Sequence, residues 1–126
     1  GEYAFIRCPS LRGELTLPDS LQRVEERGFA ECSKLESIHF PAASSLEVIG
    51  GSAFFGCSSL RGELTLPDSL KRIEEHAFYE CSELEFIHFP AASSLLEFVH
   101  KEAFIGCKPS ALPSDIIKKW NLIFEY

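Results

Sequence analysis

An internal duplication constrains the fold of this chain more strongly than any other feature of its sequence. Residues 8–46 recur at 57–95, and 31 of the 39 aligned positions are identical. A repeat at a fixed period means that each copy is a supersecondary unit whose apolar face is covered by its neighbours along the chain. We therefore expect a solenoid with one continuous core. The eight pairs that differ are Pro9/Ser58, Gln22/Lys71, Val24/Ile73, Arg27/His76, Gly28/Ala77, Ala30/Tyr79, Lys34/Glu83 and Ser37/Phe86.

Cysteines divide each long copy into two shorter units. They stand at positions 8, 32, 57, 81 and 107, at spacings of 24, 25, 24 and 26 residues. A phenylalanine precedes each cysteine by three positions. Periods of about 20–29 residues with leucine at fixed offsets are typical of leucine-rich repeats. The sequence thus predicts one domain over 1–126, with a partial repeat at 1–7, four repeats at 8–107 and a C-terminal cap at 108–126.

Two phrases recur in the units and point to one class of repeat. Residues 81–90 follow the pattern C-x-x-L-x-x-I-x-x-P, and residues 69–81 follow S-L-x-x-I-x-x-x-A-F-x-x-C. Over residues 3–107 the chain resembles the BspA-like leucine-rich repeats. The resemblance implies a curved solenoid without a catalytic motif, commonly part of a surface or secreted protein that binds host or matrix proteins. An extracellular or cell-surface location is the corresponding expectation.

Hydrophobic alternation predicts two extended segments in each unit. In residues 84–90, Ile87 and Phe89 alternate with His88, which is the period of a strand. A proline ends the strand because it has no N–H for the ladder. A second short segment, at 70–73, leads into a helical turn. We expect an α/β leucine-rich-repeat solenoid with stacked parallel strands on the concave face, short strands and helical turns on the convex side, and a C-terminal helical cap.

Stacking of the units places equivalent apolar side chains in columns, about 4.8 Å apart. Gly13 and Gly62 precede the strand core in alternate units, and glycine there tolerates the positive φ of a bulge. The phenylalanines before the cysteines form one predicted column: Phe5, Phe29, Phe54, Phe78 and Phe104. A second predicted column consists of Leu17, Phe40, Leu66 and Phe89.

The five cysteines occupy one equivalent position in every unit, which favours thiols over disulfides. Column neighbours would have Cβ atoms nearly 5 Å apart, whereas a disulfide needs about 3.5–4.5 Å. Their number is also odd. We expect buried thiols that pack as small hydrophobes and donate weakly to backbone carbonyls. No C-x-x-C or C-x-x-H spacing occurs, so we predict neither a zinc site nor a cofactor.

Polar residues on the concave strands form the candidate binding surface. His39 and His88 share one strand position and lie two rungs apart, about 9–10 Å, which is too far to share a metal ion. Phe86 replaces Ser37 of the first copy and suits an anchor for a protein partner. The predicted surface comprises Glu14, Thr16, Ser37, His39, Glu63, Thr65, Phe86 and His88. The alternative is a solvated sheet face without a partner. His76 and His100, in the turn region, are expected to be surface residues.

Enzymatic chemistry has little support in the sequence. Cysteine and histidine stand seven residues apart, as in Cys81 and His88, but the repeat directs cysteine inward and histidine outward. The glutamate pairs at 25–26 and 74–75 are adjacent at a turn, so their carboxylates diverge. A carbohydrate-cleaving enzyme of the parallel β-helix type would depend on such pairs. We predict a non-catalytic protein-recognition module, with a structural spacer that displays another domain as the alternative.

Charge narrows the range of partners. Nineteen acidic against twelve basic residues give a net charge of −7, which disfavours nucleic acid and anionic membranes. No stretch approaches the about 20 apolar residues of a membrane span. The partner that the resemblance to BspA-like repeats implies is a protein ligand. The uncapped first unit can in addition associate end to end with another copy.

The repeat pattern breaks after Cys107, and the chain is expected to close the solenoid there. Residues 108–113 correspond to a degenerate strand, and Ser114 is expected to cap a short helix at 115–120. Ile116, Ile117 and Trp120 share the helix face that covers the last rung, with Trp120 in the core of the cap and not in a partner site. Residues 122–126 are expected to add a closing strand. Because the chain starts inside a unit, we expect a piece of a longer solenoid or a mature product.

Overall fold

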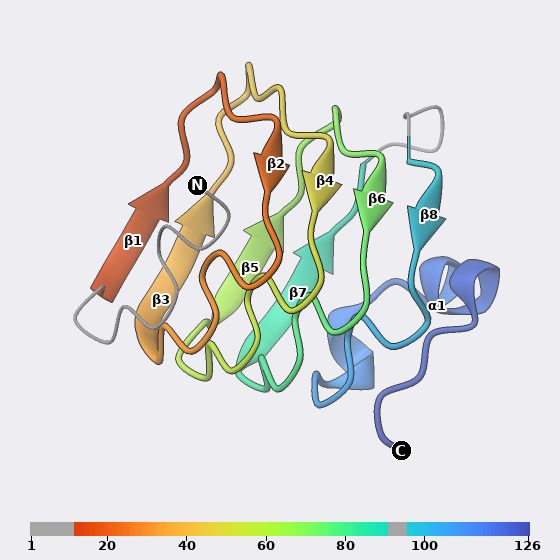
Figure 1. Ribbon diagram of the computed structural model, residues 1–126. Helices are drawn as coiled ribbons and strands as arrows, with labels where there is room; N and C mark the ends of the chain where they lie inside the picture. The colour runs from red at the N-terminus through yellow and green to blue at the C-terminus, as the bar shows by residue number, and fades with distance from the viewer. Residues whose placement is uncertain (1–11, 91–95) are drawn as a thin grey trace.

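The computed structural model describes residues 12–90 and 96–126, and over these the chain winds as a parallel-strand solenoid (Figure 1). Two layers of strands run side by side along it. The long strands are β1 (Arg12–Thr16), β3 (Lys34–His39), β5 (Gly62–Thr65) and β7 (Leu84–His88). The short strands are β2 (Arg23–Val24), β4 (Val48–Ile49), β6 (Arg72–Ile73) and β8 (Phe98–Val99). The predicted solenoid fold is confirmed. We call the outer surface of the four long strands the long-strand face.

Neighbouring coils pair in parallel throughout the short-strand layer and in two separate pairs in the long-strand layer. The short strands form one sheet in the order β2-β4-β6-β8, whereas the long strands pair as β1 with β3 and β5 with β7. The register shifts directly after Gly13 and Gly62, whose φ angles are 72° and 74°, so an irregularity occurs at the predicted positions. The additional residue lies on the neighbouring strand, as Glu36 in β3 and Glu85 in β7, and not in the strand that carries the glycine. A Cβ at either glycine would meet nothing within 4 Å. The left-handed backbone, and not crowding, therefore favours glycine at these two positions.

The phenylalanine column forms the centre of the core, as predicted. Successive ring centroids from Phe29 through Phe54 and Phe78 to Phe104 are 5.4, 5.3 and 5.4 Å apart, and the ring planes are within 12° of parallel. Phe54, Phe78 and Phe104 have no exposed surface. Burying each ring contributes about 1.5–3 kcal/mol, and the stacking adds to this. Phe5 lies outside the described residues.

The second apolar column and the thiol column also follow the prediction. Leu17, Phe40 and Leu66 are buried, and Phe89 packs partly buried against them. Each of three thiols donates to the carbonyl of the phenylalanine one coil earlier: Cys57 Sγ to Phe29 O at 3.2 Å, Cys81 Sγ to Phe54 O at 3.3 Å and Cys107 Sγ to Phe78 O at 3.3 Å. These three cysteines are thiols and not disulfides, and Cys32 is buried beside them. Cys8 lies outside the described residues.

A left-handed residue precedes each of the four cysteines that the structure describes and turns the chain back toward the long-strand face. The φ angles are 62° at Glu31, 73° at Gly56, 63° at Glu80 and 88° at Gly106. Glycine adopts this conformation without strain, but a glutamate places its Cβ too close to the backbone. The first and third of these turns therefore store backbone strain that the glycine turns avoid.

The C-terminal segment closes the last coil, although several details differ from the sequence-based expectation. Residues 109–111 form a 3₁₀ helix, η1 (Pro109–Ala111), in place of a degenerate strand, and it packs against β7. Helix α1 (Ser114–Trp120) begins one residue earlier than expected, because Pro113 takes the extended N-cap conformation and Ser114 is already helical. The Ser114 hydroxyl consequently makes no cap hydrogen bond.

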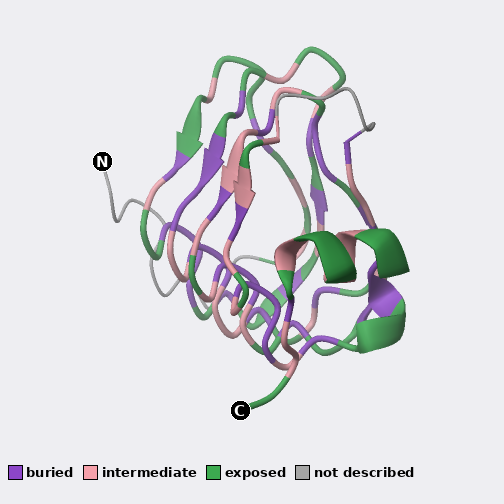
Figure 2. Cartoon of the chain, turned by 90° about the vertical axis from the view of Figure 1, so that its right-hand side faces the viewer, coloured by how far each residue is buried: buried purple, intermediate pink, exposed green. Residues whose placement is uncertain are grey.

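The chain end also continues the ladder without becoming a strand. Ile123 N donates to Lys101 O at 2.9 Å, and Gly106 N donates to Phe124 O at 2.8 Å, but these two bonds do not make the predicted closing strand. Ile116, Ile117 and Trp120 pack partly buried against the core, as expected, and Trp120 meets Phe98 edge to face. Figure 2 shows α1 across the end of the coils with its outer side exposed.

Truncating the middle of the phenylalanine column should destabilise the whole solenoid. We expect Phe54→Ala to lower the free energy of unfolding by about 3–5 kcal/mol, because it removes a fully buried ring and leaves a cavity between two stacked neighbours. Urea denaturation checks this value. Phe55→Ala is the matched control, since Phe55 is only half-buried. Equal losses for the two variants would contradict the column.

Relieving the strained turn before Cys81 should stabilise the protein. Glu80 has a φ of 63°, so Glu80→Gly should raise the free energy of unfolding by about 1 kcal/mol. Glu85→Gly, in β7, should instead lower it, because glycine weakens a strand. Thermal unfolding of both variants tests the difference, and a destabilised Glu80→Gly chain would show that this turn carries no strain.

Candidate functional site

The residues predicted to bind a partner lie in two rows across the long-strand face. The strand register places four pairs opposite one another: Glu14 and Ser37, Thr16 and His39, Glu63 and Phe86, and Thr65 and His88. Each of the eight is exposed or half-exposed, while the residues between the rows, such as Ile38 and Ile87, point into the core. The rows continue from β3 to β5, where Arg61 N donates to Glu36 O at 3.0 Å. That this surface binds a partner stays a prediction.

The second copy carries the more structured part of the long-strand face. His88 Nε2 lies 2.6 Å from Glu63 Oε1, and the Phe86 ring meets the His88 ring nearly edge to face, with 4.8 Å between their centroids. A carboxylate, an imidazole and a phenyl ring are thereby held together on two adjacent strands. The first copy has Ser37 in place of Phe86, so no such ring contact can form beside His39.

A hollow of about 280 Å³ adjoins this group where the repeats meet the cap. One wall consists of Phe86, His88, Phe89 and Pro90, and the opposite wall consists of Pro113, Asp115 and Ile116. The hollow exists because η1 and α1 follow β7 in place of another long strand. Sequence reasoning found Phe86 and His88 but not the cap residues, since the break in the repeat gives no register by which to place them.

The buried thiols do not form a nucleophilic site. Burial raises the pKa of Cys57 and of Cys107 to about 12, and burial with the neighbouring thiols raises the pKa of Cys81 well above its usual value. A thiol must ionise to act as a nucleophile. The histidines of the long-strand face are directed away from this column, since His39 is exposed and Cys32 and Cys81 are completely buried. The geometry therefore disfavours a cysteine–histidine catalytic pair.

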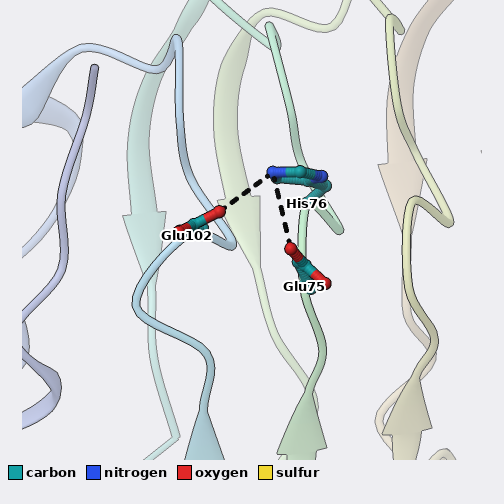
Figure 3. Close-up of side chains that lie close together, drawn as sticks. All are labelled: Glu75, His76 and Glu102. Atoms are coloured by element: carbon teal, nitrogen blue, oxygen red, sulfur yellow. Dashed lines mark ion pairs between the residues drawn. The ribbon is translucent and has the colours of Figure 1, made fainter. Parts of the chain in front are cut away.

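A second group of polar side chains gathers at the turns beyond the short strands. Figure 3 shows Glu75 and His76 from one coil and Glu102 from the next, which we call the turn-edge cluster. His76 Nε2 is 3.2 Å from Glu102 Oε1 and 4.0 Å from Glu75 Oε2. The Tyr126 hydroxyl hydrogen-bonds to the same nitrogen and donates to Glu102 Oε1 at 3.1 Å. The expectation that His76 is a surface residue is therefore only partly met, since 24% of its side chain is exposed.

Sequence reasoning missed the turn-edge cluster because its members come from two units of unequal length. The last unit has an additional residue before its phenylalanine, so a simple 49-residue alignment does not place Glu102 beside His76. A signal was nevertheless present. Three of the eight differences between the copies, at His76, Ala77 and Tyr79, fall in this turn, and the rings of His76 and Tyr79 meet edge to face at 5.0 Å.

Comparison with known proteins assigns the family. The description "BspA type Leucine rich repeat region (6 copies)" matches residues 1–117, so the chain belongs to the BspA-type leucine-rich repeats. Among solved structures, the chain is similar to the crystal structure of the T. pallidum leucine-rich repeat protein, TpLRR. That similarity has a TM-score of 0.54 and 23% identity over 97% of this chain and 76% of the other, and it shows the shared fold alone.

Two further findings concern the relatives of the chain and whether one of its helices could span a membrane. No curated protein matches the chain. Within residues 12–90 and 96–126, none of the helices has the length and apolarity to cross a bilayer. The family supports a repeat module of the kind that mediates protein interactions and is generally non-catalytic.

The thiol column should resist chemical modification in the folded protein. We expect Cys57, Cys81 and Cys107 to stay unmodified by iodoacetamide near pH 8, because their pKa values are raised and their sulfurs are buried. The same residues should react fully in guanidinium chloride. Peptide mass spectrometry reads each site separately. Rapid modification of Cys81 in the folded protein would contradict the burial of the thiol column.

Proposed function

We propose that this chain is a protein-recognition module that binds its partner through the long-strand face, within a larger surface or secreted adhesin-like protein. Membership of the BspA-type repeats supports the interaction role. Such repeats are commonly surface-associated, which supports the proposed location. The proposed unit of recognition is the whole domain, because every strand of the face is held by its neighbours.

The observation that carries this proposal is the grouping of Phe86 and His88 at the rim of the hollow. A half-exposed aromatic ring next to a recess has the character of an interface anchor, since binding energy concentrates where a large ring fills a desolvated pocket. The Glu63–His88 pair fixes the imidazole beside that ring. Fixed side chains lose little conformational entropy on binding, so this end of the face is the most favourable place for a partner to dock.

The electrostatics of the β5–β7 end of the face favour a partner with basic groups around an apolar projection. Glu63 and Glu85 are exposed there, and Asp115 lines the hollow. The basic residues of the long strands, Arg12 and Lys34, are instead exposed on β1 and β3. The chain as a whole carries a net charge of −7. Complementary charge increases the rate of encounter and selects among partners more than it adds affinity. Apolar contact with Phe86 and the hollow would then supply most of the binding energy.

End-to-end association through the first unit stays a prediction, because residues 1–11 lie outside the described residues. The partner surface proposed here lies at the opposite end of the long-strand face, on β5, β7 and the cap. The two modes of association would therefore be distinguishable by substitution on β7.

Replacing the anchor group should remove binding while leaving the fold intact. We expect Phe86→Ser combined with His88→Ala to weaken partner binding at least tenfold, since interface anchors commonly contribute more than about 1.4 kcal/mol. Phe86→Ser introduces the residue that the first copy carries at the equivalent position, so the backbone accommodates it. Surface plasmon resonance against a panel of purified extracellular-matrix proteins provides the measurement.

The matched comparison is Ser37→Ala with His39→Ala, which alters the same two positions in the first copy and should weaken binding less than the Phe86/His88 variant, because the first copy lacks the aromatic ring and does not line the hollow. Equal affinity of the wild-type chain and the Phe86/His88 variant for a matrix protein would contradict recognition through this end of the face. Binding by a longer parent protein but not by the 126-residue chain would instead support the spacer role.

A further inference from the structure

We propose that Glu75, His76 and Glu102 bind a divalent transition-metal ion and that Zn²⁺ matches their donor set best. The three side chains come from consecutive turns at the edge of the solenoid and point toward one another (Figure 3). One nitrogen and two carboxylate oxygens, one from each residue, all lie within 4.8 Å of one another. The site is separate from the long-strand face and does not depend on the proposed partner.

The distances fit a tetrahedral ion with little rearrangement. Zn²⁺ bonds to nitrogen and oxygen are about 2.0–2.2 Å long, which places neighbouring donors of a tetrahedral site about 3.3 Å apart. His76 Nε2 and Glu102 Oε1 already lie 3.2 Å apart. Glu75 Oε2 lies 4.0 Å from the same nitrogen, and 57% of its side chain is exposed, so a small rotation brings it into range. Water would complete the coordination.

The negative charge of the two carboxylates in the cluster also favours the binding of a cation. Two carboxylates face one imidazole, and among the described residues neither Glu75 nor Glu102 forms an ion pair with a lysine or an arginine. Neighbouring carboxylates repel each other unless a positive charge lies between them. A divalent ion would neutralise both, and its affinity would come from this charge as well as from the imidazole nitrogen.

The donor types separate Zn²⁺ from the abundant hard cations. Magnesium and calcium take oxygen ligands, whereas imidazole favours zinc, copper and nickel. The nitrogen that an ion needs is now hydrogen-bonded to the Tyr126 hydroxyl. Tyr126 is the last residue and is 76% exposed, so it can move away from the nitrogen and remain hydrogen-bonded to Glu102. Ion binding would then change the position of the C-terminal side chain.

The first copy of the duplication provides an internal negative control. Arg27 stands where the second copy has His76, and Ser52 occupies the position of Glu102 in the following unit. Arginine is not a metal ligand, so the equivalent turn in the first copy cannot form the site. His76 and Tyr79 both differ from their counterparts in the first copy, as does Ala77 between them, and their two rings lie together at this site.

Isothermal titration calorimetry of the 126-residue chain with Zn²⁺, in excess Mg²⁺, tests the proposal. We expect the wild-type chain to bind one ion. The affinity for Zn²⁺ should be at least tenfold weaker in His76→Arg and in Glu102→Gln. His76→Arg restores the residue of the first copy at a position where the same backbone conformation already holds Arg27, with φ angles of 59° at both. His88→Ala, which removes the histidine of the Glu63–His88 pair, should leave the affinity unchanged.

Thermal unfolding supplies a second readout. Zn²⁺ should raise the melting temperature of the wild-type chain, because the ion binds the folded turns and not the separated ligands of the unfolded chain. Glu102→Gln should fold normally, since the carboxylate is half-exposed, and should lose this shift. An absence of binding in the wild type, or equal binding by all variants, would overturn the proposal.

Discussion

Each coil of this protein depends on the next to cover its phenylalanine ring. A single unit of 24–26 residues cannot enclose an aromatic side chain, whereas a neighbour on each side leaves Phe54 and Phe78 with no exposed surface. The backbone of each turn likewise depends on the next coil, because Phe29 N donates to Ala53 O and Phe54 N donates to Ala77 O, both at 2.8 Å. The rings, thiols and backbone amides of the turns therefore form parallel columns. These columns position the other segments of each coil.

Column packing explains why the repeat could be interpreted from sequence. A residue type that recurs at each unit must occupy one environment, so phenylalanine and cysteine at fixed spacing predicted buried rings and buried thiols. The prediction also extended to hydrogen bonding, because a buried thiol donates to a carbonyl of the neighbouring coil, as Cys81 Sγ does to Phe54 O. Gly13 and Gly62 were identified for a similar reason, as the left-handed bulge accepts glycine most readily.

The parts that sequence could not predict are those where the repetition stops. After Cys107 the repeat pattern no longer applies, and carrying the strand position of the earlier units forward assigned a degenerate strand where Pro109 instead starts a 3₁₀ helix. The helix start was misplaced by one residue because a serine before an apolar run suggests a cap, while Pro113 already fills that position. The turn-edge cluster depends on an additional residue in the last unit, whose effect on alignment only the folded backbone reveals.

Duplication also determines which side chains can meet. Identical residues of the two copies lie two coils apart, so the nearest neighbour of any side chain belongs to the other kind of unit. Opposite charges meet for this reason across adjacent coils, as in Arg61 with Glu36 at 3.1 Å and Lys71 with Glu47 at 3.8 Å. These exposed pairs contribute little stability individually, but they prevent columns of like charge.

Both candidate sites lie where the second copy meets the last coil or the cap, and the fold provides a reason. Inside a regular solenoid every surface position is bounded by equivalent positions above and below, which leaves shallow and repetitive surfaces. Where the cap replaces the next coil, the long strands end against a helix and a hollow forms beside Phe86. On the turn side, the chain end returns along the last coil and brings Tyr126 to His76. A break in the repeat therefore gives nearly identical units different surroundings. The few solvent-facing residues that differ between the two copies lie there beside groups that the first copy does not meet.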